Sequence, residues 1–148
     1  MSQYTNSLAL PEQISHIGVV VKDIDETTKF LATMWGLTSW EIFDYKATQE
    51  KIIFGEPFGL RLAYTKLGST RLELIQPSNK NSIWAGFLRT HGEGIHHISY
   101  DVPRYDEMVT RLQEHGCLML VSAYNDDGTR WCYFETKPAG MIIEFEEL

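Results

Sequence analysis

The stretch HIGVVVKDIDETTKFL, residues 16–31, recurs in altered form as HISYDVPRYDEMVTRL, residues 97–112. The identical pairs are His16/His97, Ile17/Ile98, Val21/Val102, Asp25/Asp106, Glu26/Glu107 and Leu31/Leu112. The offset is 97 − 16 = 81 residues, more than half of the chain. Repeats of this length are supersecondary units whose apolar faces need a partner. The sequence therefore predicts two copies of one unit that pair into one body.

Each copy begins with a strand signal that is followed by a helix signal. The β-branched run from Ser15 to Val21 predicts a strand, and Asp23 with Glu26 gives a capping-box start for a helix that ends at Gly36. The second copy predicts a strand from Ile95 to Val102 and a helix closed by Gly116. The apolar residues of that second helix recur at helical spacing, at Tyr105, Met108, Val109 and Leu112.

Three further strand segments follow each helix, separated by glycine and proline signals. They are Trp40 to Tyr45 with Lys51 to Phe54, Leu60 to Leu67 and Thr70 to Gln76 in the first copy, and Cys117 to Ala123, Arg130 to Thr136 and Met141 to Glu146 in the second. We expect an α+β fold in which two tandem βαβββ modules pair into one curved mixed-sheet domain around a central metal cavity. Residues 1–148 form this single domain, with module one at about 14–77, a linker helix capped by Ser82 at about 78–92, and module two at about 93–148.

A glutamate follows each repeated histidine in an alternating strand. Glu73 and Glu144 are each flanked by two apolar residues, so each carboxylate points to the face opposite its neighbours. If the helices cover the apolar faces, the other faces of the two modules form a shared cavity. We expect His16, Glu73, His97 and Glu144 to converge there, provided that the first and last strands of each module pair.

Two imidazoles and two carboxylates without a thiolate suit a borderline divalent ion, Co, Zn, Ni, Mn or Fe, and the sequence does not choose among these ions. A single histidine is more often structural than a ligand, but matched places in a repeat reverse that preference. His96 is expected to be structural and to point into the helix-covered side, because neighbouring strand residues face opposite ways. Glu146 and Glu147 are interpreted as a solvated terminus.

Composition excludes several classes of partner. The chain has 148 residues, a formal net charge of −7 and no basic patch, which argues against nucleic acid and anionic membranes and favours a small-molecule substrate. Cys117 and Cys132 form no disulfide framework or CxxC motif and are expected to be reduced core thiols. The first residues do not resemble a signal peptide, and no apolar run reaches membrane-spanning length. We expect a cytoplasmic protein.

Several segments carry a family resemblance. They are HIGVVVKDID from His16, LELIQP from Leu72 to Pro77, and IWAGFLRTHGEGIHHISYDV from Ile83 to Val102. With them the chain resembles the vicinal oxygen chelate superfamily, which includes glyoxalase I, extradiol dioxygenases and bleomycin-binding proteins, and within it methylmalonyl-CoA epimerase-like proteins. The resemblance implies paired βαβββ modules and metal ligands at His16, Glu73, His97 and Glu144.

The chain departs from the epimerase pattern at two places. The resemblance implies a glycine-rich turn and an HPKS-like stretch before the last strand, whereas residues 125–140 of this chain are NDDGTRWCYFETKPAG. The resemblance therefore supports an acyl-CoA pocket less than it supports the metal site. The second acid/base carboxylate that the resemblance implies on a strand of the first module is replaced near Arg61. A two-base epimerisation is therefore less secure than the metal site.

The expected function is a metal-dependent enzyme that abstracts a proton next to a chelated carbonyl, of the epimerase or isomerase type. Glu144 is the first candidate for a ligand that also moves protons, and Glu73 is its counterpart. The alternatives are a glyoxalase I-like lactoylglutathione lyase and a non-catalytic small-molecule-binding protein of the same fold. Ring-cleaving oxygenation is disfavoured, because that chemistry uses two histidines and one carboxylate and leaves more open positions.

Substrate contacts are assigned to Arg61, Tyr100 and Arg130, although either arginine is equally compatible with a surface position. Aromatic side chains are candidates for the cavity lining, with packing as the simpler interpretation of each: Trp40, Tyr64, Tyr100, Trp131 and Tyr133. A homodimer is expected because relatives often form one.

Overall fold

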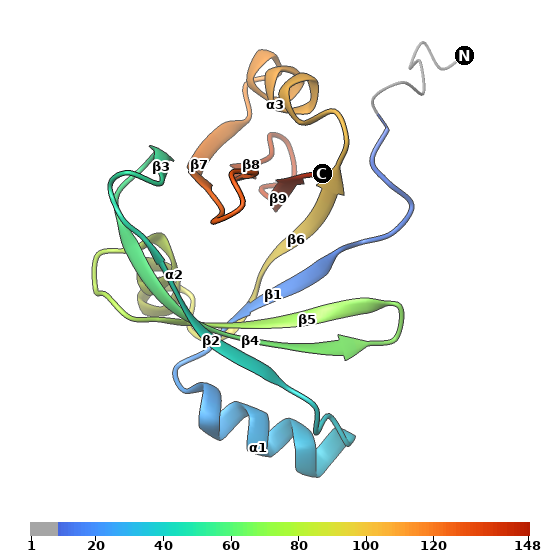
Figure 1. The fold of residues 1–148 in the computed structure, drawn as a ribbon, viewed down its shortest axis with the longest axis vertical. Helices are drawn as coiled ribbons and strands as arrows, with labels where there is room; N and C mark the ends of the chain where they lie inside the picture. Colours follow the sequence, from blue (N-terminus) through green and yellow to red (C-terminus); the bar gives the residue numbers. More distant parts are fainter. Residues whose placement is uncertain (1–8) are drawn as a thin grey trace.

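The computed structural model describes residues 9–148, which contain nine strands and three helices (Figure 1). In order they are β1 (His16–Val20), α1 (Ile24–Trp35), β2 (Glu41–Ala47), β3 (Ile52–Phe54), β4 (Phe58–Leu67), β5 (Thr70–Pro77), α2 (Ile83–Thr90), β6 (Gly94–Val102), α3 (Tyr105–Glu114), β7 (Leu118–Tyr124), β8 (Arg130–Glu135) and β9 (Ile142–Glu147). The strands form one mixed sheet in the order β2-β4-β5-β1-β6-β9-β8-β7-β3. The sheet curls, and α1 and α3 lie outside it at opposite ends.

The strand pairing confirms the predicted duplication. Within the first module β1 runs parallel to β5, and within the second β6 runs parallel to β9. The two modules are joined where β1 pairs antiparallel with β6, with Gly18 opposite His97. The first and last strands of each module therefore lie next to each other, as convergence of the two histidine–glutamate pairs requires.

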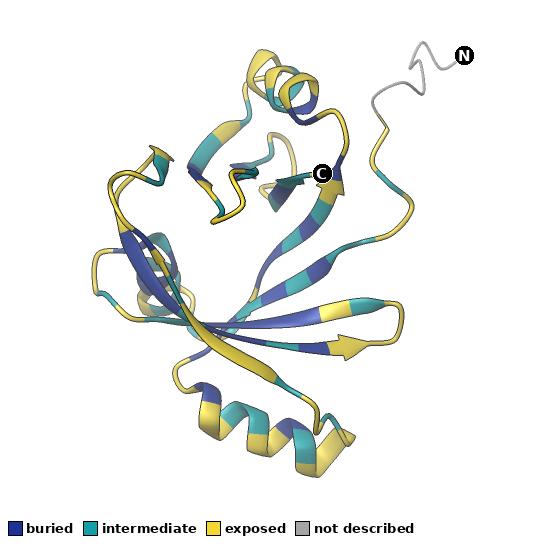
Figure 2. Ribbon diagram, in the orientation of Figure 1, coloured by how far each residue is buried: buried dark blue, intermediate teal, exposed yellow. Residues whose placement is uncertain are grey.

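Local signals explain where α1 begins and ends. The Asp23 carboxylate accepts a hydrogen bond from the backbone N–H of Glu26, and Gly36 ends the helix in the left-handed conformation at φ 70°. The inner face of α1 packs through Ile24 and Leu31 against the outer face of the sheet (Figure 2). The corresponding α3 packs its inner face against β8 and β9. The prediction that the helices cover the apolar faces of the modules is confirmed.

The inner face of the sheet is more apolar than the sequence pattern indicated. It carries a large buried cluster to which α2 contributes Trp84, whose side chain is 1% exposed. Phe58 and Tyr133 pack against this indole, and Trp131 packs against both of them. Helix α2 thus fills one end of the inner face, and the predicted polar cavity occupies only the remaining part.

Strand β3 corrects the predicted organisation of the first module. The segment was expected to accompany β2, but β3 pairs with β7 of the second module, where Ile52 lies opposite Ala123. Strands β2 and β3 are therefore the two edges of the sheet, joined by residues 48–51 alone. A sequence pattern shows that two runs are extended, but not which partner strand each run finds.

Two other expectations concern the chain as a whole. Cys117 and Cys132 are both free thiols. Cys132 is buried as predicted, whereas Cys117 is only partly buried. Within residues 9–148, the helices are all too short or too polar to cross a membrane.

Candidate metal centre

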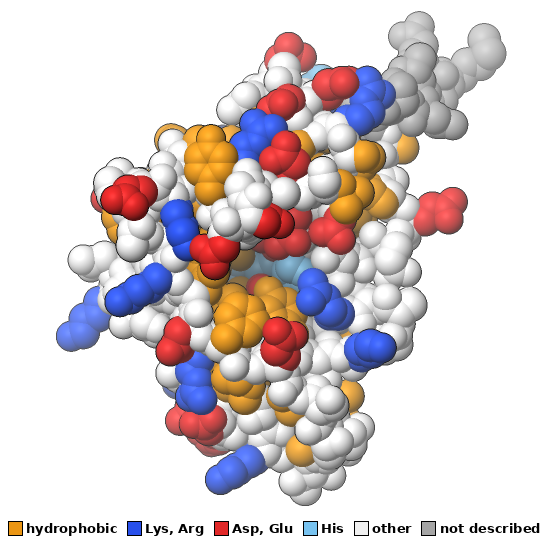
Figure 3. Space-filling model, viewed as in Figure 1, with side chains coloured by type: hydrophobic (Ala, Val, Ile, Leu, Met, Phe, Trp, Pro, Cys, Tyr) orange, Lys and Arg blue, Asp and Glu red, His pale blue; other side chains and the backbone are white. Residues whose placement is uncertain are grey.

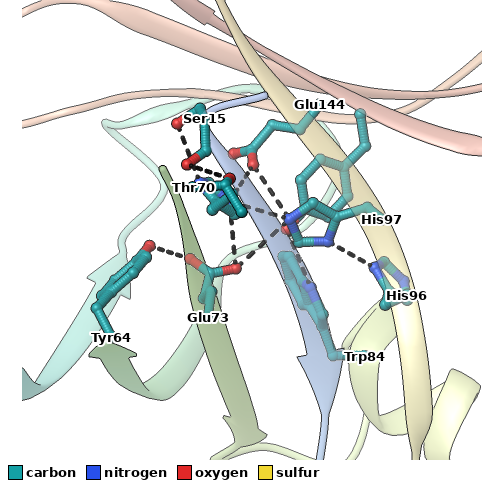
Figure 4. Close-up of polar contacts among 10 residues, drawn as sticks. Ser15, Tyr64, Thr70, Glu73, Trp84, His96, His97 and Glu144 are labelled. Atoms are coloured by element: carbon teal, nitrogen blue, oxygen red, sulfur yellow. Dashed lines mark hydrogen bonds and ion pairs between the residues drawn. The ribbon is translucent and has the colours of Figure 1, made fainter. Parts of the chain in front are cut away.

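The structure brings the four predicted ligands together on four adjacent strands of the inner face (Figure 4). His16 lies on β1, Glu73 on β5, His97 on β6 and Glu144 on β9. Each of these side chains is buried, with no residue more than 5% exposed. Strand alternation and the parallel pairing within each module place all four on the same side of the sheet.

The distances among His16, His97 and Glu144 suit a common ion, and Glu73 lies beside these three groups. The Nε2 atoms of His16 and His97 are 3.3 Å apart, and Glu144 Oε2 lies 3.0 Å and 3.2 Å from them. Glu73 Oε1 lies 3.6 Å and 3.4 Å from the same two nitrogens. Ligand atoms about 2.0–2.2 Å from an ion such as Zn²⁺ are about 3.3–3.6 Å apart in a tetrahedral site and somewhat closer in an octahedral one. The observed spacing falls in this range.

Unsatisfied polar atoms at this place support the same interpretation. Buried oxygens rarely lack a hydrogen-bond partner. Among residues 9–148, Ser99 Oγ is buried without one, and Ser99 is paired in register with both His16 and Glu144. The buried oxygens Glu73 Oε1 and Glu144 Oε2 face the two histidine rings and have no other donor in the described part of the chain. The tightest group consists of His16, His97 and Glu144, whose ligand atoms all lie within 4.8 Å of one another, with Glu73 beside it.

The buried histidines and carboxylates of the site shift one another's pKa values. Burial disfavours the protonated ring of His97, but hydrogen bonds and charge from Glu144 and Glu73 outweigh it and raise its pKa to about 9. The pKa of His16 is raised in the same way against the effect of burial. Burial favours the neutral form of Glu144, yet hydrogen bonds from the two histidines lower the pKa of its carboxyl. Without an ion, protons on the histidines therefore balance the carboxylates.

Each candidate histidine has a partner for its second ring nitrogen, supplied by the residue immediately before it. Ser15 Oγ lies 3.3 Å from His16 Nδ1, and His96 Nδ1 lies 3.1 Å from His97 Nδ1. Burial and the neighbouring His97 lower the pKa of His96 to about 3, so its ring is neutral and can accept the His97 Nδ1 proton. Such partners fix the orientation of a ligand ring.

The position of His96 corrects the expectation from strand alternation. It was predicted to point away from the site, but its ring contacts His97, Tyr133 and Phe87 of α2. The cause is a bulge in β6, since His97 pairs with Gly18 whereas the next bridge skips to Ile95. His96 is still interpreted as a structural residue rather than a ligand, but it lies at the site, where it contacts the ring of His97.

Gly18 leaves the space that the ring of His97 occupies. A Cβ atom at residue 18 would lie 2.1 Å from His97 Cε1. No side chain fits at this distance, so the glycine lets the two central strands bring the imidazole over β1.

A cavity of about 160 Å³ adjoins the four groups. Figure 3 looks onto this hollow, where pale-blue histidine side chains are visible between acidic, basic and hydrophobic ones. The lining residues are Phe43, Tyr45, Leu60, Leu62, Tyr64, Glu73, Trp84, Asn125, Trp131, Tyr133, Glu144 and Glu146. Of the aromatic candidates, Tyr64, Trp131 and Tyr133 line the cavity, while Trp40 and Tyr100 pack in the clusters beneath α1 and α3. The Tyr64 hydroxyl donates a hydrogen bond to Glu73 Oε2.

Glu146 was wrongly assigned to a solvated terminus. It lies on β9 two residues after Glu144, shares its face and lines the cavity. Burial and the charge of Glu144 raise the pKa of Glu146 to about 8. Glu147 points the other way and pairs with Arg130. The two-residue spacing from Glu144 was the signal that could have placed Glu146 in the site.

The structure does not bring the three predicted substrate contacts to the cavity. Arg61 forms an ion pair with Asp25 of α1, because its neighbours Leu60 and Leu62 take the inner face. Arg130 pairs with Asp106 and Glu147. Tyr100 packs against the apolar cluster beneath α3.

Comparison with known proteins identifies the family. The model of the Glyoxalase/Bleomycin resistance protein/Dioxygenase superfamily matches residues 15–133, and the chain belongs to this superfamily. Among its relatives, human mitochondrial methylmalonyl-CoA epimerase is 25% identical over 115 residues, which cover 77% of this chain and 60% of that protein. An ethylmalonyl-CoA/methylmalonyl-CoA epimerase of Cereibacter sphaeroides is 29% identical over 112 residues, covering 74% of this chain and 75% of that protein.

A solved structure shares the architecture. The methylmalonyl-CoA epimerase of Streptomyces coelicolor, in complex with 2-nitronate-propionyl-CoA, superposes with a TM-score of 0.69 at 25% identity and covers 94% of this chain and 98% of that one. The chain spans less than two thirds of the human relative's length. These similarities establish the curled mixed-sheet fold and point to epimerase-type relatives.

Proposed function

We propose that this protein is a metal-dependent enzyme that moves a proton at the carbon next to a carbonyl group, in the manner of an epimerase or isomerase. The observation that carries the proposal is the convergence of two histidines and two buried carboxylates at one end of a cavity. Epimerases among its relatives support the same reaction class.

The residues fit a divalent ion. His16, His97 and Glu144 would hold it, with Glu73 as the fourth group, because the buried oxygens of the two glutamates and the Nε2 atoms of the two histidines face one another. Imidazole and carboxylate ligands suit Co, Zn, Ni, Mn or Fe. When bound, such an ion supplies Lewis-acid polarisation of a substrate carbonyl.

Proton transfer is assigned to the two carboxylates. Glu144 is kept ionised by its histidine neighbours and borders the cavity, so its carboxylate can accept a proton there. Glu73 also borders the cavity, and the hydrogen bond from Tyr64 to Oε2 leaves Oε1 directed at the histidines. The two carboxylates come from different modules, so one can take a proton and the other can return it.

Strand β4 contributes no carboxylate to the cavity that could act as a second base in proton transfer. Its cavity-facing side chains are Leu60, Leu62 and Tyr64, none of which is a carboxylic acid. The carboxylates among the described lining residues are Glu73, Glu144 and Glu146. Any two-base reaction must therefore use this set, which differs from the arrangement expected for the epimerase relatives.

Metal analysis and isotope exchange test the proposal together. Wild-type protein is expected to retain a divalent ion that His97→Ala loses. His115→Ala, which changes an exposed histidine at the C-terminal end of α3, should retain the ion. Equal ion content in wild type and His97→Ala would contradict the site. Incubation in D₂O with methylmalonyl-CoA and with hemithioacetals should place deuterium next to a carbonyl.

Substitution of the proposed base separates ion binding from proton transfer when exchange is compared at matched ion occupancy, because Glu144 is also a candidate ligand. Glu144→Gln is expected to slow deuterium exchange by at least about a hundredfold, the contribution typical of general acid–base catalysis. Glu41→Gln, an exposed carboxylate on β2, is the matched control and should exchange at the wild-type rate. A Glu144→Gln protein that keeps its ion and full exchange would show that Glu144 does not move the proton.

A further inference from the structure

We propose that the cavity binds a planar, uncharged ring of the substrate, so that this protein acts on a ring-bearing carbonyl compound. The inference deepens the proposed function and rests on it for the position of the carbonyl at the histidine–glutamate cluster. It names the chemical class of the substrate group beyond that carbonyl, which neither the fold nor the four candidate ligands specify.

Away from its polar end the cavity is lined mainly by aromatic rings, with Leu60 and Leu62 of β4 beside them. The rings come from β2, β4 and β8 and from α2, and they are Phe43, Tyr45, Tyr64, Trp84, Trp131 and Tyr133. Phe43 and Tyr64 are stacked on the first module with ring centroids 5.9 Å apart, while Trp131 and Tyr133 adjoin each other on the second module. A ligand ring between these walls meets aromatic edges and faces, which favour other planar rings.

The polar groups of these side chains are already occupied. Trp131 Nε1 donates to the Tyr45 hydroxyl over 3.2 Å, and Trp84 Nε1 donates to the Tyr133 hydroxyl over 3.4 Å. The Tyr64 hydroxyl is bonded to Glu73. Because the two indole N–H groups and the Tyr64 hydroxyl bond within the wall, these rings present mainly carbon surface to the cavity.

The volume of the cavity and the charges of its lining residues limit which ligand groups can enter it. The cavity measures about 160 Å³, and an apolar cavity of about 150 Å³ is known to hold one benzene molecule. None of the described lining residues is lysine or arginine, and Glu146 adds a carboxyl group to the wall. An anionic group has no cationic partner inside, so the part of the ligand within the cavity is one neutral ring, and any nucleotide portion lies outside.

Phenylpyruvate and 2-oxobutyrate test the inference, since both carry the same 2-oxo acid and only the first carries a ring. Calorimetric titration of the purified, ion-containing protein should give at least about tenfold tighter binding of phenylpyruvate, the gain expected from burying a phenyl group. Affinities within about threefold of each other would overturn the inference.

A pair of neighbouring variants distinguishes the cavity from general surface hydrophobicity. Phe43 and Ile42 are adjacent on β2 and similarly exposed, at 39% and 41%, but only Phe43 lines the cavity. Phe43→Ala should weaken phenylpyruvate binding by about threefold to tenfold and leave 2-oxobutyrate unchanged, while Ile42→Ala affects neither. Equal weakening of both ligands by Phe43→Ala would contradict a ring site.

The results also separate this inference from the proposed function. Ring-selective binding without deuterium exchange would support the ring site and contradict the proton-transfer reaction. Exchange on methylmalonyl-CoA without any preference for phenylpyruvate would support the reaction and overturn the ring site.

Discussion

His16 Nε2 and His97 Nε2 lie 3.3 Å apart, although 81 residues separate these histidines in the sequence. They meet because β1 and β6 pair antiparallel at the junction of the two modules. Each module supplies one histidine and one glutamate, so neither module contains the candidate site alone. Binding of an ion would therefore stabilise the junction as well as the site.

Gly18→Ala is expected to lower ion affinity at least about tenfold, the scale on which loss of support for a ligand acts. The added Cβ would lie 2.1 Å from His97 Cε1, so the imidazole must leave its position. Metal content after dialysis against a graded chelator measures the loss. Gly59→Ala is the control, because its Cβ would meet Ser78 Cβ at an ordinary 3.5 Å. Equal ion retention by both variants would refute the role of Gly18.

His96→Ala is expected to reduce ion affinity by about 10- to 100-fold without removing a ligand, because His97 loses the partner of its Nδ1 atom. Ser15→Ala should act in the same direction through His16. His91→Ala removes an exposed histidine near α2 and serves as the control. If His96→Ala bound the ion as wild type does, the contact between the two rings would have no orienting effect.

Tyr64→Phe is expected to retain the ion while deuterium exchange slows by about tenfold or more, since a hydrogen bond to a charged group contributes about 1.5–3 kcal/mol. The change removes the hydroxyl that holds Glu73 Oε2 and leaves the ring in place. Exchange rates at matched ion occupancy provide the measurement. Tyr124→Phe changes an exposed tyrosine at the end of β7 and should leave the exchange rate unchanged. An unchanged exchange rate in Tyr64→Phe would exclude a contribution of this bond.

The thermal stabilisation provided by an added divalent ion is expected to grow between about pH 6.5 and pH 9. In the ion-free protein the raised pKa of His97, about 9, means that its proton stabilises the fold fully below the unfolded pKa of 6.5 and that this contribution is lost as pH rises toward 9. The ion competes with that proton for His97, so its affinity for the folded protein rises as the proton dissociates. Calorimetry with ion and with chelator measures the difference in Tm, which should not widen in His97→Ala. A difference that narrows with pH would contradict the coupling.

Arg61→Ala and Arg130→Ala are expected to change kcat and KM by less than about twofold, as is usual for surface substitutions away from a site. Their guanidinium groups pair with Asp25, and with Asp106 and Glu147, rather than with the cavity. Steady-state kinetics with any substrate that supports exchange provide the test. A large rise in KM for either variant would restore the substrate-binding role that the sequence suggested.

Local sequence patterns were sufficient to predict the helices and strands of each module. Asp23 and Gly36 delimit α1 because capping depends on side chains within a few residues. Convergence of the four candidate ligands required that the first and last strands of each module pair, and the structure has both pairings, β1 with β5 and β6 with β9. Alternation then assigned Glu73 and Glu144 to the same side as the histidines, since the face of a side chain follows from its parity in the strand.

Alternation failed where the strand is irregular or the partner is distant. The bulge in β6 keeps His96 at the site, and the local sequence does not predict that one residue of this strand has no partner on β1. The pairing of β3 with β7 and the aromatic walls of the cavity depend on how the sheet curls.

The sequence by itself determined the duplication, the helices and the four histidine and glutamate positions, because these depend on short-range periodicity and on comparison of the chain with itself. Only the tertiary structure decided that Glu146 joins the cavity, that Arg61 and Arg130 do not, and that aromatic rings from both modules enclose it. Those features arise from contacts between distant segments, whose geometry is set by sheet curvature rather than by any one stretch of residues.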